Sequence, residues 1–122
     1  MNELSKARQL VDQAWQRLEH WERNIAAAQA LLEDARASRP HDPQVLTCLG
    51  AVLCDRALYH EAEAVLRDAL AQGSLDRHTT LNLAVAVFHT GTRRQALALF
   101  GAAAKLQPSA STWAAYFDPH GT

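Results

Sequence analysis

Apolar residues recur at helical spacing along most of the chain. Positions three, four and seven residues apart share one side of an α-helix, and three stripes of this kind stand out. They are Leu4, Val11, Trp15 and Leu18; Val45, Leu49, Val52 and Leu53; and Leu81, Leu83, Ala84 and Val87. No alternating run is flanked by Asn-Gly or Asp-Gly, which is the pattern typical of a β-hairpin. The hydrophobic pattern therefore predicts an all-α protein.

Helix boundaries follow from the residues that interrupt this pattern. Proline cannot continue a helix, so Pro40 and Pro108 are expected to close two of the helical units. Asn24 and Gly91 are expected at turns, where a residue that tolerates the left-handed conformation ends a helix. Trp15 is expected in the core. The predicted helices span residues 2–22, 24–37, 43–55, 59–72, 77–90, 93–106 and 109–117.

The last predicted helix is short and aromatic. It contains Trp113, Tyr116 and Phe117, begins at a Ser109 or Ser111 cap, and ends at Pro119 and Gly121. Three aromatic side chains so close together are expected to be covered rather than solvated. We expect this helix to cap the open end of the preceding helices; the alternative is a docking or dimer surface, since Trp and Tyr favour interfaces.

The chain also superposes on itself when it is shifted by 34 residues. Small residues align with small residues, and large apolar residues align with large ones. The aligned columns are Ala28, Ala62 and Ala96; Ala35, Ala69 and Ala103; Leu32, Leu66 and Phe100; and Trp15, Leu49 and Leu83. Pro40 and Pro108 end the first and third units, with Ser74 at the corresponding place in the second.

These columns resemble the tetratricopeptide repeat (TPR) family, whose 34-residue pattern reads W-x2-L-G-x2-Y, then A-x3-F, then P. The second unit matches at Leu46, Leu49, Gly50, Leu53, Ala62, Leu66 and Ala69, and the third at Leu83, Ala84, Val87, Ala96, Phe100, Ala103 and Pro108. The first unit departs from the pattern at Gln16 and Glu19. The resemblance implies one domain, residues 1–122, in which three helix–turn–helix repeats (9–42, 43–76 and 77–110) form a right-handed α-solenoid followed by a capping helix at 109–117.

The resemblance further implies a partner-binding groove on the inner wall formed by the first helix of each pair. Carried over by the 34-residue register, the groove residues are Gln13, Arg17, His20, Trp21, Thr47, Ala51, Cys54, Asp55, His78, Leu81, Val85, Phe88 and His89. Apolar at its centre, this set suits an amphipathic helix or an extended apolar segment of another protein. The alternative is that these residues pack under the chain's own termini or line an unused face. Trp21 is the aromatic residue most readily assigned to a ligand.

Some members of this family grip the C-terminal carboxylate of a partner with Lys, Asn and Arg side chains. The corresponding residues here are Gln13, Arg17, Cys48, His78 and Asn82. The cationic pair of the third unit is missing, so a carboxylate would lose its main charge-assisted hydrogen bonds. We therefore expect a different kind of ligand.

The function implied by the resemblance is binding of a partner polypeptide without catalysis, as in an adaptor or a small bacterial chaperone. The alternative is a self-association or assembly module. In that case the groove or the C-terminal aromatic residues would pair with a second copy in a homodimer.

The charge composition narrows the class of partner. The chain has 12 Lys and Arg against 13 Asp and Glu, with no block of like charge. Nucleic-acid binding and electrostatic membrane anchoring both need a clustered basic surface, so neither partner is expected. The N-terminus has no apolar signal core, and a cytoplasmic location is expected.

Candidate chemistry is sparse. His20, Cys54, Asp55 and His89 offer ligand types that zinc accepts, and Cys54 with a histidine on the next helix could mimic a Cys–His pair, but no paired spacing such as C-x2-C or H-x3-H occurs. Nor does the sequence contain a glycine-rich phosphate loop or paired carboxylates. We expect no metal, no cofactor and no catalysis. Cys48 and Cys54, six residues apart on one predicted helix, lie roughly 9 Å apart along its axis and are too distant for a disulfide.

Overall fold

The computed structural model describes residues 2–117 and is all-helical, as predicted. Its elements are α1 (Glu3–Gln16), a short 3-10 turn η1 (Leu18–His20), α2 (Trp21–Ser38), α3 (Pro43–Asp55), α4 (Tyr59–Ala71), α5 (Arg77–Thr90) and α6 (Arg93–Ala103). No β-strand occurs among the described residues; there is only an isolated bridge between Asp76 and Gln107.

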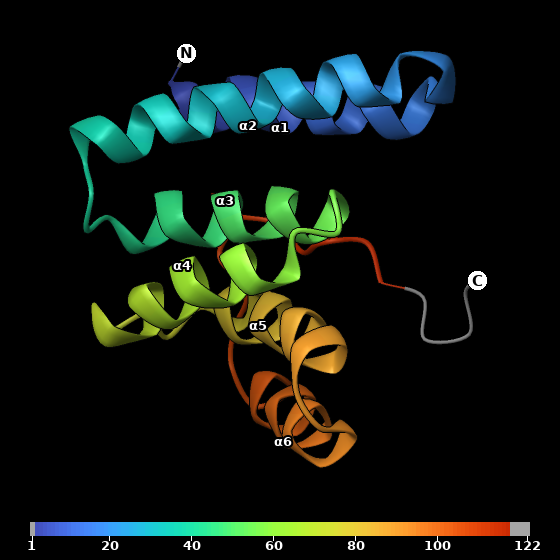
Figure 1. The fold of residues 1–122 in the computed structure, drawn as a ribbon. Helices are drawn as coiled ribbons and strands as arrows, with labels where there is room; N and C mark the ends of the chain where they lie inside the picture. Colours follow the sequence, from blue (N-terminus) through green and yellow to red (C-terminus); the bar gives the residue numbers. More distant parts are fainter. Residues whose placement is uncertain (1, 118–122) are drawn as a thin grey trace.

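Consecutive helices form three antiparallel pairs, α1–α2, α3–α4 and α5–α6 (Figure 1). The pairs pack on one another through α2 against α3, α4 against α5, and α3 against α5. In contrast, α1 packs mainly on α2 and meets α3 at few positions. The space between α1 and α3 is therefore open to another part of the chain.

Polar caps explain where several helices begin. The Asp42 carboxylate accepts the Gln44 backbone N–H at 2.9 Å, and Pro43 stands at the first helical position of α3, where its missing N–H costs nothing. Thr92 and Gln95 form a reciprocal capping box at the start of α6. These local signals agree with the predicted starts of α3 and α6.

The boundary predicted at Asn24 is wrong. Asn24 lies inside α2, and the first helix ends earlier, at Gln16. Arg17 leaves the helical conformation with φ −132° and ψ 87°, and η1 completes the turn. The tight turn brings Trp15 and Trp21 together edge to face, with ring centroids 5.7 Å apart.

The expectation that Trp15 is a core residue is also wrong, because its side chain is 40 % exposed. Leu49 and Leu83, which align with it in the 34-residue register, are fully buried. Trp15 stands in the last turn of α1, the helix that meets α3 at few positions, and its ring packs on Trp21 and Tyr116 without being fully covered.

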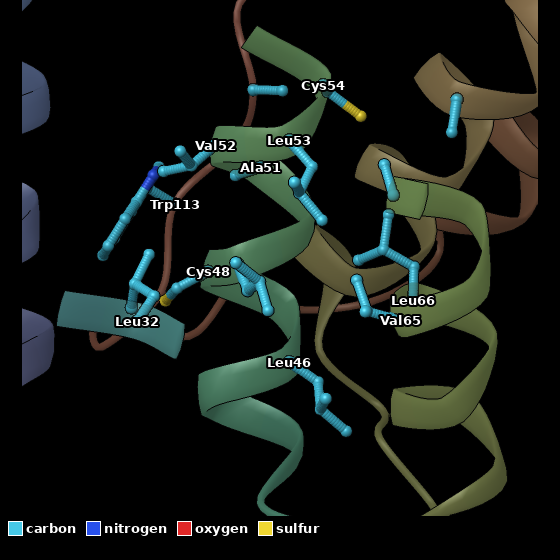
Figure 2. Close-up of a cluster of buried hydrophobic side chains, with 14 of the residues drawn as sticks. Leu32, Leu46, Cys48, Ala51, Val52, Leu53, Cys54, Val65, Leu66 and Trp113 are labelled. Atoms are coloured by element: carbon cyan, nitrogen blue, oxygen red, sulfur yellow. The ribbon is translucent and has the colours of Figure 1, made fainter. Parts of the chain in front are cut away.

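Burial follows the 34-residue register inside the helix pairs. Ala28, Ala62 and Ala96 are all completely buried, as small residues must be where two helices approach closely. Gly50 of α3 is a stricter case: a Cβ atom at this position would lie 2.4 Å from the Leu66 side chain of α4. Leu66 and its neighbour Val65 point from α4 toward α3 in Figure 2.

The C-terminal capping helix predicted at 109–117 is not present. After α6 the chain turns and runs back past α5 and α3 in an extended conformation (Figure 1). The helix is absent because side chains of α3 and α5 bind the backbone groups that a helix would pair internally. Pro119 and Gly121, predicted to end this helix, lie outside the described residues.

Within residues 2–117, no helix combines the length and the apolar character that crossing a membrane requires.

The packing of Gly50 generates a prediction. Gly50→Ala should lower the free energy of unfolding by about 1–3 kcal/mol, because the added methyl group overlaps Leu66 and overpacking outweighs the gain in helix propensity. Gly101→Ala is the matched control: this helical glycine has open space at its Cβ position, and alanine should stabilise by about 0.5–1 kcal/mol. Urea denaturation of both variants measures the contrast, and equal effects would contradict the close approach of α3 and α4.

Candidate functional site

The candidate site is the surface formed by α1, α3 and α5, which we call the α1/α3/α5 face. It is occupied by the chain's own residues 109–117, called here the C-terminal segment. Every helix of the face contacts this segment, α1 through Arg8, α3 through Asp55 and α5 through Asn82. The face therefore already holds an extended polypeptide.

From Trp113 to Phe117, side chains of the C-terminal segment alternate in burial, whereas Thr112 just before them is buried as well. Trp113 and Ala115 are buried and Phe117 is half-buried, whereas Ala114 and Tyr116 are exposed. In extended backbone, successive side chains point to opposite sides, so alternate residues face the helices. Residues 113–117 thus form an extended stretch that packs on a helical surface rather than on another strand.

Asn82 of α5 holds the middle of the segment. Its amide nitrogen donates to the Trp113 carbonyl at 3.1 Å, and its amide oxygen accepts the Ala115 N–H at 2.8 Å. The side-chain amide thereby imitates a neighbouring strand, satisfying a carbonyl and an N–H two residues apart. These bonds involve backbone groups only and do not depend on which side chains the segment carries.

Asp76 anchors the start of the segment. This residue caps α5 by accepting the His78 N–H at 3.0 Å, and the same oxygen accepts the Ser109 N–H at 2.9 Å. Its second carboxylate oxygen accepts the Thr112 hydroxyl. Because that hydroxyl proton is directed at Asp76, His78 donates from Nδ1 to the Thr112 oxygen over 2.9 Å. Burial lowers the pKa of His78, although the Asp76 charge opposes this effect, so a neutral ring is favoured.

Trp113 fills the space between the first helix pair and α3. Only 4 % of its surface is exposed, and Figure 2 shows it beside Leu32, Cys48 and Val52, on the side of α3 away from Leu66. The Arg8 guanidinium lies 5.5 Å from the centre of its ring, within the range of a cation–π interaction. Trp113 therefore replaces the direct packing that α1 and α3 lack.

The last described residues bind at the other end of the face. The Asp55 carboxylate accepts the Tyr116 N–H at 2.9 Å, and the Tyr116 ring lies against Trp15 with centroids 5.1 Å apart. The Phe117 ring stands between Phe88 of α5 and Phe100 of α6, each at 5.2 Å. The Asp55 carboxylate and three aromatic rings of the helices, those of Trp15, Phe88 and Phe100, thus fix this end.

Burial strongly affects Asp55. It raises the pKa of the carboxyl to about 6, although hydrogen bonds from the Tyr116 amide and the Trp15 side chain favour the ionised form. The carboxylate is mostly ionised at pH 7 but close to its titration range.

The predicted groove residues fall into two groups. Asp55, His78 and Phe88 contact the C-terminal segment, so they pack under the chain's own terminus, which is the alternative to a partner-binding groove. The rest have other surroundings. Thr47 is buried and bonds to Thr79 of α5, Cys54 donates to the Asn82 carbonyl, and His89 stacks on Tyr59 of α4 at 3.8 Å. Ala51 and Val85 are buried, Leu81, His20 and Trp21 are half-buried, and Gln13 and Arg17 are exposed.

The predicted groove does not include five residues that contact the C-terminal segment: Arg8, Trp15, Cys48, Asp76 and Asn82. The 34-residue register predicts that Gln13 and Arg17 are the groove residues of the first helix. That helix ends at Gln16, however, so the register does not describe its last turn. The sequence places Asn82 only at a position that corresponds to a carboxylate ligand of the repeat family. Its place one turn after His78, inside the otherwise apolar run of residues 81–88, is the signal that marks it.

The structure gives no support to thiol or metal chemistry. Burial raises the pKa of Cys48, and burial together with the Asp55 charge raises that of Cys54 to about 12, so both thiols stay protonated at neutral pH. His20, Cys54 and His89 do not converge: among residues 2–117, no three His, Cys, Asp or Glu side chains are placed to hold a metal ion.

Comparison with protein-family models finds no family that matches the chain, and comparison with curated proteins finds no relative.

Asn82→Ala should release the C-terminal segment, because it leaves the Trp113 carbonyl and the Ala115 N–H without partners at a cost of about 1–3 kcal/mol for each buried group. Hydrogen exchange followed by mass spectrometry should show faster exchange at 112–117 with α2 and α4 unchanged. Val87→Ala is the control: it removes buried methyl groups from the same helix, beside Gly91, and should not act selectively on 112–117. Equal exchange in both variants would contradict the role of Asn82.

Asp55 should make stability depend on pH. Its pKa is about 6 in the folded protein against 3.8 ordinarily, so the folded state binds the proton more tightly. This contribution to stability is present below about pH 4 and is lost as the pH rises through 6. Asp55→Asn lacks it, so its free energy of unfolding relative to wild type should increase by up to about 3 kcal/mol between pH 4 and pH 7. Urea denaturation at several pH values tests this, with exposed Asp34→Asn expected to follow wild type.

Proposed function

We propose that the protein is a non-catalytic protein–protein interaction module that binds a partner polypeptide on its α1/α3/α5 face. In this proposal the three helix pairs are TPR-like repeats forming a right-handed solenoid. The 34-residue recurrence of buried alanines and the contact of Gly50 with Leu66 support that assignment. An adaptor or a small chaperone fits this description, and the two free, buried thiols fit a reducing cytoplasm.

The observation that carries the proposal is the pair of hydrogen bonds from Asn82 to the backbone of the C-terminal segment. Backbone recognition by a side-chain amide suits an extended chain of varied sequence, as in binding modes that add a strand to a surface. Asp55 adds a third backbone contact at Tyr116. A partner could use the same three contacts.

The C-terminal segment competes with any such partner. A tethered ligand acts at an effective concentration on the order of millimolar, so a partner must displace it and its apparent affinity is reduced accordingly. Weakening the segment should therefore strengthen partner binding. This relation distinguishes a binding face from a purely structural one.

A second candidate function is self-association. Phe88, Leu97, Phe100 and Phe117 line an almost entirely apolar pocket of about 400 Å³ on the last helix pair, and Leu97 is exposed. An exposed apolar surface at the end of a stack of helices suits a second copy. Light scattering over a range of concentrations measures this, and a monomer throughout would exclude it.

Polypeptide binding can be tested with Thr112→Val/Phe117→Ser, which weakens both ends of the C-terminal segment and keeps Trp113 in place. Fluorescence anisotropy of two labelled probes, one extended apolar peptide and one amphipathic helical peptide, should show at least one bound about tenfold more tightly than by wild type. Adding Asn82→Ala should reverse most of the gain for an extended peptide. If the folded variant binds neither probe at millimolar concentration, the proposed function is wrong.

A further inference from the structure

We infer that the α1/α3/α5 face selects one class of partner: an extended segment of another protein that carries a hydroxyl residue, a large aromatic residue, a large apolar residue, a small residue, any residue and a second aromatic residue, in that order. The inference rests on the proposed function and names its ligand. The positions correspond to Thr112, Trp113, Ala114, Ala115, Tyr116 and Phe117.

The positions of Thr112 and Trp113 select their side chains by hydrogen bonding and by size. A hydroxyl at the Thr112 position donates to Asp76 and accepts from His78, which no apolar side chain can do. The next position lies between the first helix pair and α3 and requires a large ring, since Trp113 is 4 % exposed there and Arg8 covers its face. A carboxylate at the hydroxyl position would face Asp76 and be repelled.

The third position explains how a partner can displace the chain's own segment. A cleft of about 420 Å³ remains beside Trp113, between α1 and α3, and Ala114 is one of the residues that line it. The cleft wall combines the apolar side chains of Val11 and Trp15 with polar ones, Arg8, Asp12, Asp55 and His78, and is more apolar than polar. A Leu or Phe side chain in place of the Ala114 methyl group would bury the apolar part of this surface. A ligand with such a residue would therefore bind more tightly than the chain's own segment.

The last positions set the spacing. Ala115 is buried where Asn82 binds the backbone, so a large side chain there would push the backbone away from its hydrogen bonds. The Tyr116 ring packs on Trp15 but is 63 % exposed, so this position can accept varied side chains. The Phe117 ring lies between Phe88 and Phe100, so the position directly after Tyr116 requires an aromatic residue.

A second copy of this chain is a poorer occupant than a different protein. Its C-terminal segment would make the same contacts as the tethered one but would also lose translational and rotational freedom. The tether is itself fastened, because the Gln107 carbonyl accepts the Arg77 N–H at 2.9 Å and the Arg77 side chain donates to the Ala103 and Ala104 carbonyls. Only a ligand with better contacts, such as one that fills the cleft, gains by exchange.

The test uses the full chain with one exposed substitution. Tyr116→Cys is labelled with bimane; Cys48 and Cys54 are buried, so labelling is selective. Trp15 lies close to the ring at position 116 and quenches the label, and displacement of the segment restores its fluorescence. Synthetic peptides of residues 107–122 are then titrated: the native sequence, Ala114→Leu, Trp113→Ala, Ala115→Leu, Tyr116→Ala and a scrambled sequence, with an unrelated amphipathic helical peptide alongside.

The inference predicts an order of displacement. Relative to the native peptide, Ala114→Leu should act at about threefold or more lower concentration, because it buries additional apolar surface. Trp113→Ala and Ala115→Leu should need at least about tenfold more, and Tyr116→Ala should stay within about twofold. Hydrogen exchange of the unlabelled wild-type chain with each peptide gives the same order without any substitution.

Each other result overturns the inference in a distinguishable way. If the scrambled or helical peptide displaces the segment as well as the native one, the face binds polypeptides without this pattern, and the proposed function stands alone. If light scattering shows that the labelled chain forms dimers with exchanged segments, the occupant is a second copy. If no peptide displaces the segment or binds at millimolar concentration, both the inference and the proposed function fail.

Discussion

Asn82 is completely buried, and its side-chain amide must find hydrogen-bond partners inside the protein. The helices around it offer only the Thr47 carbonyl, at a long 3.4 Å. The remaining donor and acceptor capacity is met by the Trp113 carbonyl and the Ala115 N–H. The arrangement of α1, α3 and α5 thus depends on an extended chain lying across them, since without one a polar group would be stranded among apolar neighbours. The protein's own C-terminal segment and a partner polypeptide could both satisfy Asn82, so they would compete for the same position.

Much of the helical architecture could be predicted from the sequence, because it depends on local signals. The stripes, the Asp42 and Thr92 caps and the position of Pro43 lie within a few residues of the boundaries that they set. The 34-residue register also predicted the buried alanines correctly, since it reflects a packing need that recurs in each pair. The first pair was predicted less well, because Arg17 leaves the helix without any proline or glycine to signal it.

The C-terminal segment could not be predicted in the same way. Its serine caps and its alanines favour a helix locally, but its conformation is set by Asp55, Asp76 and Asn82, which lie tens of residues away. The hydrophobic pattern of a segment does not show whether its backbone groups will bond within a helix or to side chains that are distant in the sequence. In the same way, the 34-residue register assigned Asp55, His78 and Phe88 to the wall of a groove for a partner, whereas they contact the chain's own C-terminal segment, and it did not include Arg8. A register assigns residues to the faces of helices and does not identify the ligand that crosses them.

The two ends of the C-terminal segment are held unequally, and this decides how it can leave. The first end is tied covalently to α6, fastened by Arg77 and anchored by both oxygens of Asp76. The second end depends on the Asp55 carboxylate, whose burial opposes the charge that binds the Tyr116 amide, and on partly exposed aromatic rings. Opening should therefore begin at Phe117 and proceed toward Trp113, because the weaker contacts break first. A partner that entered by this route would first take over the aromatic positions and Asp55, and would reach the Asn82 amide only after the chain's own backbone had left it.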